Sequence, residues 1–91
     1  MFVVVSYDIV EDKKRNKLAK KMCGFGSRVQ YSVFECIVNA AQYKRMKQEA
    51  LKWIDPETDS LRLYILCGEC REKIESYGRK RGIEEDGAVV V

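Results

Sequence analysis

Histidine is absent from this chain, and its absence limits the chemistry that the protein can perform. Histidine is the side chain whose charge changes near neutral pH, and it is the commonest protein ligand of metal ions. The sequence therefore excludes histidine-based acid–base catalysis and every histidine-ligated metal site. If the chain hydrolyses a substrate, a metal ion must supply the activated water.

Long hydrophobic runs are also absent. The longest apolar stretches cover residues 2–5 and 87–91, whereas a transmembrane helix needs about 20 apolar residues. Asp8 interrupts any candidate for the apolar core of a signal peptide. We therefore expect no membrane segment, no signal peptide and a cytoplasmic location.

Size and composition indicate one small folded domain over residues 1–91. Hydrophobic residues make up 46% of the 91 residues and charged residues 34%, which is typical of a globular chain. A domain of this size buries only about 60–65% of the surface that its unfolded chain exposes. Disulfides, a metal ion or a partner subunit are therefore expected sources of added stability.

The positive charge is concentrated in one segment. The net charge is only +3, but residues 13–21 read KKRNKLAKK and hold six basic side chains in nine positions. Acidic side chains gather near the other end, at residues 84–86. One surface of the protein should therefore be strongly positive, either as a solvated helix face or as a site for an anionic partner.

Runs of β-branched and aromatic residues predict strands over residues 2–7, 28–38 and 61–67. The second run is longer than a usual strand, so we expect a tight reversal near residues 30–32. Less distinct patterns predict a short strand within residues 72–78 and a final strand over residues 88–91.

Apolar side chains at helical spacing predict two helices. The first covers residues 12–22, with Asp12 as its N-cap, and ends at Gly24 and Gly26. The second begins at residue 39 or 40 and continues to about residue 54, where Asp55 and Pro56 end it. Its buried side is predicted to consist of Tyr43, Met46, Ala50 and Trp53.

This order of elements predicts an α+β fold, a ferredoxin-like sandwich of the βαββαβ type with an extra C-terminal strand. Both helices then cover one face of the sheet. In the first strand Phe2 and Val4 point to one face while Val3 and Val5 point to the other, so both faces are apolar. The uncovered face needs a partner, and we expect a homodimer, either with sheet facing sheet or with residues 79–91 as an extension that pairs with the other subunit.

Four segments resemble a known family when they are taken together. They are SYDI at residues 6–9, the basic helix with Arg15, GFGSRVQYSVFE at residues 24–35 and DSLRLY at residues 59–64. They resemble the small Cas-two nuclease family, the second of the two CRISPR-associated spacer-acquisition proteins. The resemblance implies a ferredoxin-like homodimer, a metal-dependent endonuclease acting on RNA or DNA, and a complex with the Cas-one integrase.

The resemblance also implies the candidate site. Asp8 matches the metal-binding and catalytic acid, and Tyr7 precedes it. A carboxylate at a strand end suits Mg²⁺ or another divalent cation, and two copies of Asp8 could meet across a dimer axis. The positions expected to contact nucleic acid are Lys14, Arg15, Lys17, Arg28, Ser32 and Phe34.

Each of these side chains also has a structural interpretation. Asp8 could cap a turn, the two arginines could form surface ion pairs, and Tyr7, Ser32 and Phe34 could be ordinary strand residues. Arginine and lysine that contact phosphates read charge and shape, so no sequence preference is expected. The partners implied are double-stranded DNA and, as a second candidate, single-stranded RNA. Two other functions compete with this one: a non-catalytic scaffold and a toxin-type endoribonuclease of related fold.

Cysteine occurs four times, at positions 23, 36, 67 and 70, and we expect reduced thiols because nothing marks the chain as secreted. Cys67 and Cys70 form a Cys-x-x-Cys pair, which occurs in redox couples and as half of zinc sites. A second such pair is missing, so two packed thiols at a strand end are the preferred interpretation. A metal carrier of this fold would have the pair directly after the first strand, where this chain has Asp8 and Ile9.

Overall fold

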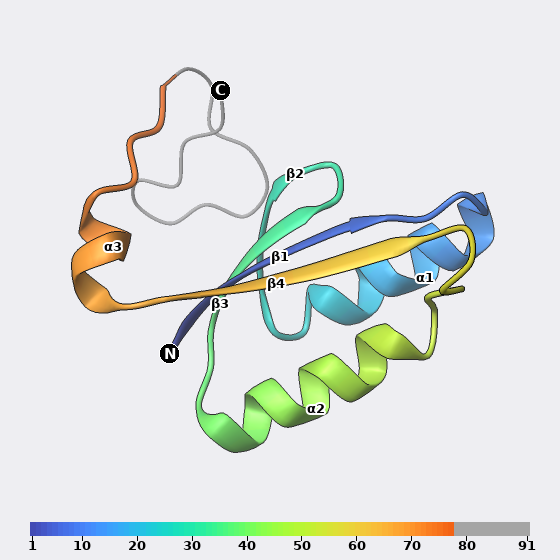
Figure 1. The fold of residues 1–91 in the computed structure, drawn as a ribbon, viewed down its shortest axis with the longest axis horizontal. Helices are drawn as coiled ribbons and strands as arrows, with labels where there is room; N and C mark the ends of the chain where they lie inside the picture. Colours follow the sequence, from blue (N-terminus) through green and yellow to red (C-terminus); the bar gives the residue numbers. More distant parts are fainter. Residues whose placement is uncertain (78–91) are drawn as a thin grey trace.

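The computed structural model describes residues 1–77, which form a four-stranded antiparallel sheet in the order β2-β3-β1-β4 (Figure 1). The strands are β1 (Phe2–Asp8), β2 (Gly26–Gln30), β3 (Val33–Ile37) and β4 (Ser60–Leu66). The helices are α1 (Asp12–Met22), α2 (Ala40–Leu51) and α3 (Gly68–Glu72). The order of elements up to β4 is the βαββαβ order predicted from the sequence, and the α+β fold is confirmed.

None of the helices in residues 1–77 has the length and the apolar composition that crossing a bilayer requires.

Strand β1 lies in the middle of the sheet, between β3 and β4. Val5 faces Phe34 of β3 and Leu63 of β4, and Asp8 at the end of β1 faces Ser60 at the start of β4. A central strand that is buried on one face favours β-branched residues, as in the run of valines in this strand. The alternation along β1 therefore determines which side chains enter the core.

The predicted reversal within residues 28–38 is confirmed. Strands β2 and β3 pair directly, and Tyr31 and Ser32 form the turn between them. At the start of β2 the backbone of Gly26 lies so close to β3 that an added Cβ would be 2.3 Å from the carbonyl oxygen of Glu35. Only glycine fits such a close approach of two backbones. Gly26 is therefore required at the start of β2 by its contact with β3.

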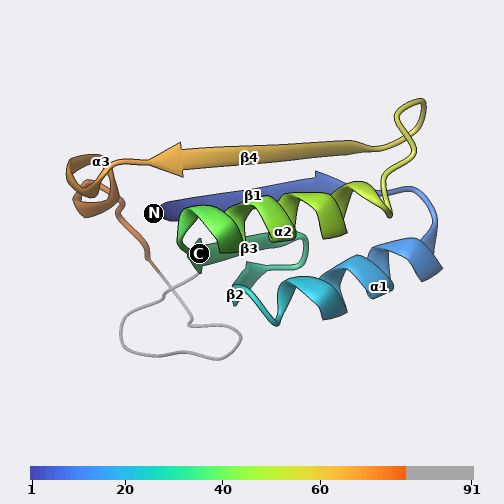
Figure 2. The same cartoon turned by 90° about the horizontal axis from the view of Figure 1, so that it is seen from below.

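Helices α1 and α2 lie side by side on the same face of the sheet (Figure 2). Asn39 caps α2 with a capping box, in which its side chain and that of Gln42 each bond the other's backbone at 2.8 Å. The helix ends at Leu51, three residues before the predicted end. The next N–H groups, from Lys52 to Ile54, bond carbonyls three positions back, so the last turn tightens and leaves the α-helix.

The predicted N-cap of α1 is wrong by one residue. Glu11 occupies the N-cap position without a side-chain cap, and Asp12 is the first helical residue. The carboxylate of Asp12 is bound by the guanidinium group of Arg15, one turn later, so it does not accept from the helix N-terminus.

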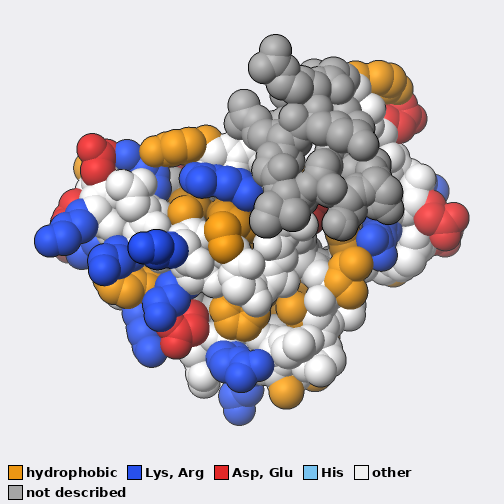
Figure 3. Space-filling view, turned by 180° about the vertical axis from the view of Figure 1, so that it is seen from behind, with side chains coloured by type: hydrophobic (Ala, Val, Ile, Leu, Met, Phe, Trp, Pro, Cys, Tyr) orange, Lys and Arg blue, Asp and Glu red, His pale blue; other side chains and the backbone are white. Residues whose placement is uncertain are grey.

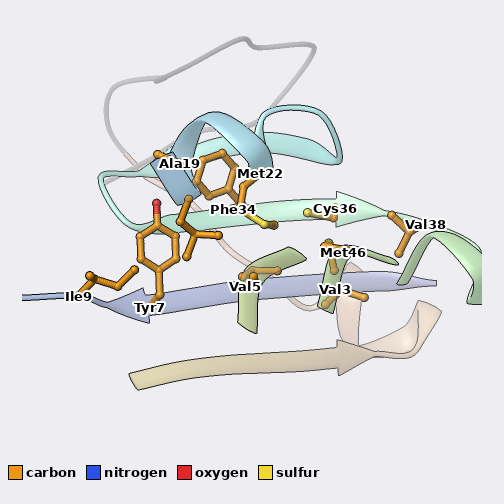
Figure 4. Close-up of a cluster of buried hydrophobic side chains, with 12 residues drawn as sticks. Val3, Val5, Tyr7, Ile9, Ala19, Met22, Phe34, Cys36, Val38 and Met46 are labelled. Carbon is orange, nitrogen blue, oxygen red and sulfur yellow. The ribbon is translucent and has the colours of Figure 1, made fainter. Parts of the chain in front are cut away.

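The hydrophobic core lies between the sheet and these two helices (Figure 4). Val3, Val5 and Tyr7 enter it from β1, and Phe34 and Cys36 enter it from β3. The helices contribute Leu18, Ala19, Met22, Met46 and Ala50. The predicted pair of apolar positions four apart in α1, Leu18 and Met22, is therefore buried as expected.

The other face of the sheet has no helix of the described chain over most of its area. Its apolar members include Val4 of β1, Tyr64 of β4, which is 45% exposed, and Ile37 of β3, which is 64% exposed. Phe2 on the same face is covered by Arg71, whose guanidinium carbon lies 4.6 Å from the ring centroid. Both faces of β1 are thus apolar, as the alternation of its sequence predicts.

The prediction of a short strand within residues 72–78 is wrong for residues 72–77, which are the part that the structure describes. The chain instead forms the short helix α3 directly after β4, and residues 74–77 have no regular structure. Cys67 is the N-cap of α3, and its Sγ accepts a hydrogen bond from the backbone N–H of Cys70 at 3.4 Å. The predicted strand at 88–91 and the extension at 79–91 lie outside the described residues.

Candidate nucleic-acid interface and metal site

Asp8 is the last residue of β1, and its side chain is exposed to solvent. The backbone on its C-terminal side is held in two ways. The carbonyl oxygen of Ile9 accepts a hydrogen bond from Arg15 at 2.9 Å, and the N–H of Val10 donates to the carboxylate of Asp59 at 3.0 Å. The strand end that presents Asp8 is therefore fixed from both α1 and the segment before β4.

Asp59 is a site residue that sequence reasoning missed. Its Oδ1 accepts from Val10, and its Oδ2 accepts from the backbone N–H of Asp55 at 2.9 Å. The hydrogen bond from Val10, followed by that from Asp55, lowers the pKa of this carboxyl from its ordinary value. The signal in the sequence was an aspartate just after the Asp55-Pro56 turn and just before a strand, since aspartate often bonds nearby backbone groups.

Arg15 acts mainly as an anchor of the same corner. Besides its bond to Ile9, its Nε donates to the hydroxyl of Tyr31 at 3.3 Å, and its other guanidinium nitrogen binds Asp12. The pKa of Arg15 is raised, first by the hydrogen bond to Tyr31 and then by that to Asp12. The structure shows the ion pair of Arg15 with Asp12, which is the structural interpretation of this residue. Contact of Arg15 with phosphate stays a prediction.

Arg28 reaches the turn between β2 and β3. Its Nε and Nη2 donate to the carbonyl oxygen of Tyr31 at 3.0 and 2.6 Å. Its guanidinium carbon lies 5.2 Å from the Tyr31 ring centroid and 5.8 Å from that of Phe34, while Arg15 lies 5.6 Å from the Tyr31 ring. Tyr31, which sequence reasoning did not select, thus contacts both arginines predicted to bind phosphate.

The other predicted side chains lie behind this surface. Tyr7 and Phe34 are buried, with ring centroids 6.4 Å apart and planes at 20° (Figure 4). The Tyr7 hydroxyl is buried and has no hydrogen-bond partner among the described residues. Burial raises the pKa of Tyr7, and the nearby charge of Arg28 partly opposes this effect. The carbonyl oxygen of Ser32 accepts a hydrogen bond from the backbone N–H of Tyr7 at 3.2 Å, so Ser32 joins the turn between β2 and β3 to the end of β1.

The exposed basic surface lies on α1 (Figure 3). Lys13, Lys17 and Lys20 share one side of the helix, because they are spaced by four and three residues. Together with Arg28 of β2 they border an open hollow of about 410 Å³ whose lining contains no carboxylate. Within residues 1–77 these three lysines form no ion pair, whereas Lys14 pairs with Glu11 at 3.8 Å. Of the predicted contact residues, Lys17 and Arg28 therefore line the hollow and Lys14 does not.

A single chain supplies few ligands for a metal ion. In residues 1–77 there is no group of three or more histidine, cysteine, aspartate or glutamate side chains that could hold one. Mg²⁺ commonly binds through one or two carboxylates and completes its shell with water and substrate phosphates. An exposed, unobstructed carboxylate such as Asp8 fits that mode, in which a second carboxylate would come from a partner subunit.

Comparison with known proteins identifies the family. The family model described as CRISPR associated protein Cas2 matches residues 1–74. CRISPR-associated endoribonuclease Cas2 1 of Chloroflexus aurantiacus is 47% identical over 79 residues, which cover 86% of this chain and 85% of that protein. CRISPR-associated endonuclease Cas2 of Halalkalibacterium halodurans is 38% identical over 95 residues, which cover 99% of each chain. The crystal structure of Streptococcus pyogenes Cas2 matches with a TM-score of 0.76 at 36% identity, over 86% of this chain and 100% of that one. The resemblance inferred from the four sequence segments is confirmed, and the chain belongs to the Cas2 family of CRISPR-associated proteins.

Proposed function

We propose that this chain acts in CRISPR spacer acquisition as a homodimer that binds the backbone of duplex DNA together with the Cas-one integrase. Membership of the Cas2 family supports the biological setting. The observation that supports backbone binding is the hollow bordered by Lys13, Lys17, Lys20 and Arg28, which contains no acidic side chain.

The electrostatics of the hollow favour a polyanion. Lysines spaced three and four apart on one helix repel one another by a few tenths of a kcal/mol for each pair. A row of phosphates relieves this repulsion and releases the counterions of the nucleic acid, which favours binding at low salt. Because such contacts read charge and shape, the protein should bind duplexes of unrelated sequence equally well.

Phosphodiester cleavage is the catalytic part of the proposal, with Asp8 as the metal-binding residue. Two relatives are named endoribonuclease and endonuclease, which supports hydrolysis of RNA or DNA as the reaction class. Mg²⁺, when bound, would activate water and neutralise the charge of the phosphate. The chain's own contribution is an exposed carboxylate on a rigid strand end, held by Arg15 and Asp59, which would meet its counterpart in a symmetric dimer.

The salt dependence of duplex binding tests the interface. In the variant Lys13→Ala with Lys17→Ala and Lys20→Ala, we expect weaker binding and a log–log salt slope smaller by about 0.9 for each phosphate that the variant no longer neutralises. Fluorescence anisotropy over a series of salt concentrations measures both quantities. Duplexes of two unrelated sequences should be affected to the same extent.

A matched control removes the same charge from the other helix. Lys44, Arg45 and Lys47 of α2 are all exposed, and the triple alanine variant lowers the net charge by the same amount. We expect its salt slope to stay that of the parent protein. An unchanged slope in the α1 variant, or equal losses in both variants, would place the nucleic acid elsewhere.

A further inference from the structure

The Cys67 and Cys70 pair has a geometry that its sequence motif alone does not reveal. Cys67 directly follows β4 and is the N-cap of α3. Cys70 lies three residues later, in the first turn of the helix. Residues three apart in a helical turn have Cβ atoms about 5–6 Å apart, whereas the Cβ atoms of a disulfide are about 3.5–4.5 Å apart. Both side chains are exposed and lie at the start of a short helix, so a bridge requires this end of the helix to close by about 1–2 Å.

The pKa values of the two thiols shift in opposite directions because of the hydrogen bonds between these residues. Sγ of Cys67 accepts the backbone N–H of Cys70 at 3.4 Å. This bond, together with the one from the Cys70 thiol, lowers the pKa of Cys67, while the same thiol contact raises the pKa of Cys70. Cys67 is thus the thiol that ionises first, and the thiolate is the nucleophile in disulfide exchange.

The remaining cysteines are different. Cys36 is buried in the core, and burial raises its pKa to about 11. Cys23 is exposed at the end of α1 and is remote in sequence from the pair. The chain therefore provides one inert thiol and one isolated exposed thiol as internal references for the pair.

A small reagent has access to the pair. Like Cys70, Cys67 is exposed. The next residue, Gly68, has open space where a side chain would be. A low-molecular-weight disulfide can therefore approach the sulfur of Cys67 from solvent.

We propose that Cys67 and Cys70 are a redox-active dithiol that forms a reversible intramolecular disulfide by exchange with a low-molecular-weight disulfide. The Cys67 thiolate attacks one sulfur of the small disulfide, and the S–S bond of that disulfide breaks. The small thiolate that leaves takes up the proton that Cys67 gave to solvent. The Cys70 sulfur, as it loses its proton, then attacks the Cys67 sulfur and expels the second small thiol. Two protein thiols are oxidised to one disulfide, and one small disulfide is reduced to two thiols. The proposal does not depend on nucleic-acid binding or on Asp8.

The experiment uses the full-length reduced protein equilibrated with mixtures of reduced and oxidised glutathione. The reaction is stopped with acid, remaining thiols are alkylated after unfolding, and the tryptic peptide 63–71, which contains both cysteines, is analysed by mass spectrometry. We expect this peptide to lose the mass of two hydrogen atoms and to escape alkylation, and to recover both thiols in excess reduced glutathione. Cys36 should be fully alkylated in the same sample.

Single variants separate the pair from the other thiols. Cys23→Ser should leave the internal disulfide unchanged, whereas Cys67→Ser and Cys70→Ser should each abolish it and leave a glutathione adduct on the remaining cysteine. A peptide 63–71 that stays a dithiol while Cys23 becomes glutathionylated would overturn the proposal. So would stoichiometric zinc that is bound through both cysteines and protects them from the oxidant, because the pair would then be a metal site.

Discussion

Asp59 and Val10 are 49 positions apart in the chain, yet the carboxylate of Asp59 accepts the backbone N–H of Val10 at 3.0 Å. Since the same carboxylate also accepts the N–H of Asp55, it joins the turn after Asp8 to the connection between α2 and β4. This side chain and Arg15, which bonds the carbonyl oxygen of Ile9, together hold the backbone after Asp8.

The stability contributed by Asp59 should depend on pH. Its folded-state pKa is lowered, chiefly by the hydrogen bond from Val10, so its contribution is present above the unfolded pKa of about 3.9 and is lost as pH falls through the folded value. Asp59→Asn should lower the thermal midpoint at neutral pH, and the difference from the parent protein should shrink below about pH 4. Glu57→Gln, a change in the same exposed loop, is the control. A difference that is constant down to about pH 2 would contradict the assignment.

Asp8→Asn separates catalysis from a structural role. The substitution removes the negative charge that Mg²⁺ requires and keeps nearly the same volume, so cleavage should fall by about 100-fold or more while the fold and DNA affinity persist. Removal of divalent cations with a chelator should have the same effect on the parent protein. Glu57→Gln again removes one exposed charge as a control.

Spacer acquisition with the integrase should survive in the Asp8→Asn protein, because holding DNA requires shape and basic charge but no metal. An acquisition assay in cells measures this. If the Asp8→Asn protein is folded, dimeric and binds DNA but fails to support acquisition, then acquisition requires the metal-binding carboxylate and the role of the protein is catalytic.

Tyr7→Phe tests whether the hydroxyl of Tyr7, the residue before Asp8, takes part in the chemistry. The hydroxyl is buried without a partner among residues 1–77, and removing an unsatisfied polar group should raise the free energy of unfolding by about 1 kcal/mol. Urea denaturation measures this change, and a cleavage assay should give the rate of the parent protein within about twofold. A large loss of cleavage in a stable variant would instead assign Tyr7 a catalytic role.

Dimerisation through the uncovered sheet face is tested with Val4→Asp. Val4 lies at the centre of that face, and a charge buried there without a partner should weaken dimerisation by at least about 100-fold. Sedimentation gives the oligomeric state, and circular dichroism checks the fold. Gln48→Asp on the exposed side of α2 is the control. If the parent protein is itself a well-folded monomer at micromolar concentration, this face is not the dimer interface.

The secondary structure could be predicted where local signals are strong. The valines of β1, the spacing of Leu18 and Met22 in α1 and the start of α2 depend on signals within a few residues. Strand β1 and helix α1 formed where expected, and α2 began where expected but ended three residues early. The segment after Gly68 could not be predicted in this way, since propensity favours a helical turn there while Gly68 and Gly78 leave little length for one. The hydrogen bond from the Cys70 N–H to the Cys67 sulfur accompanies the helical turn there.

The sequence by itself determined the family, the acid at the end of the first strand and the basic segment that follows it. Only the tertiary structure decided which cations face solvent. Arg15 bonds the carbonyl oxygen of Ile9, while Lys13, Lys17 and Lys20 remain available and border a hollow together with Arg28. The physical reason is that hydrogen bonds such as that from Arg15 to Tyr31, or from Val10 to Asp59, join segments brought together by the sheet. No local pattern in the chain encodes which carbonyl or carboxylate a long side chain will meet.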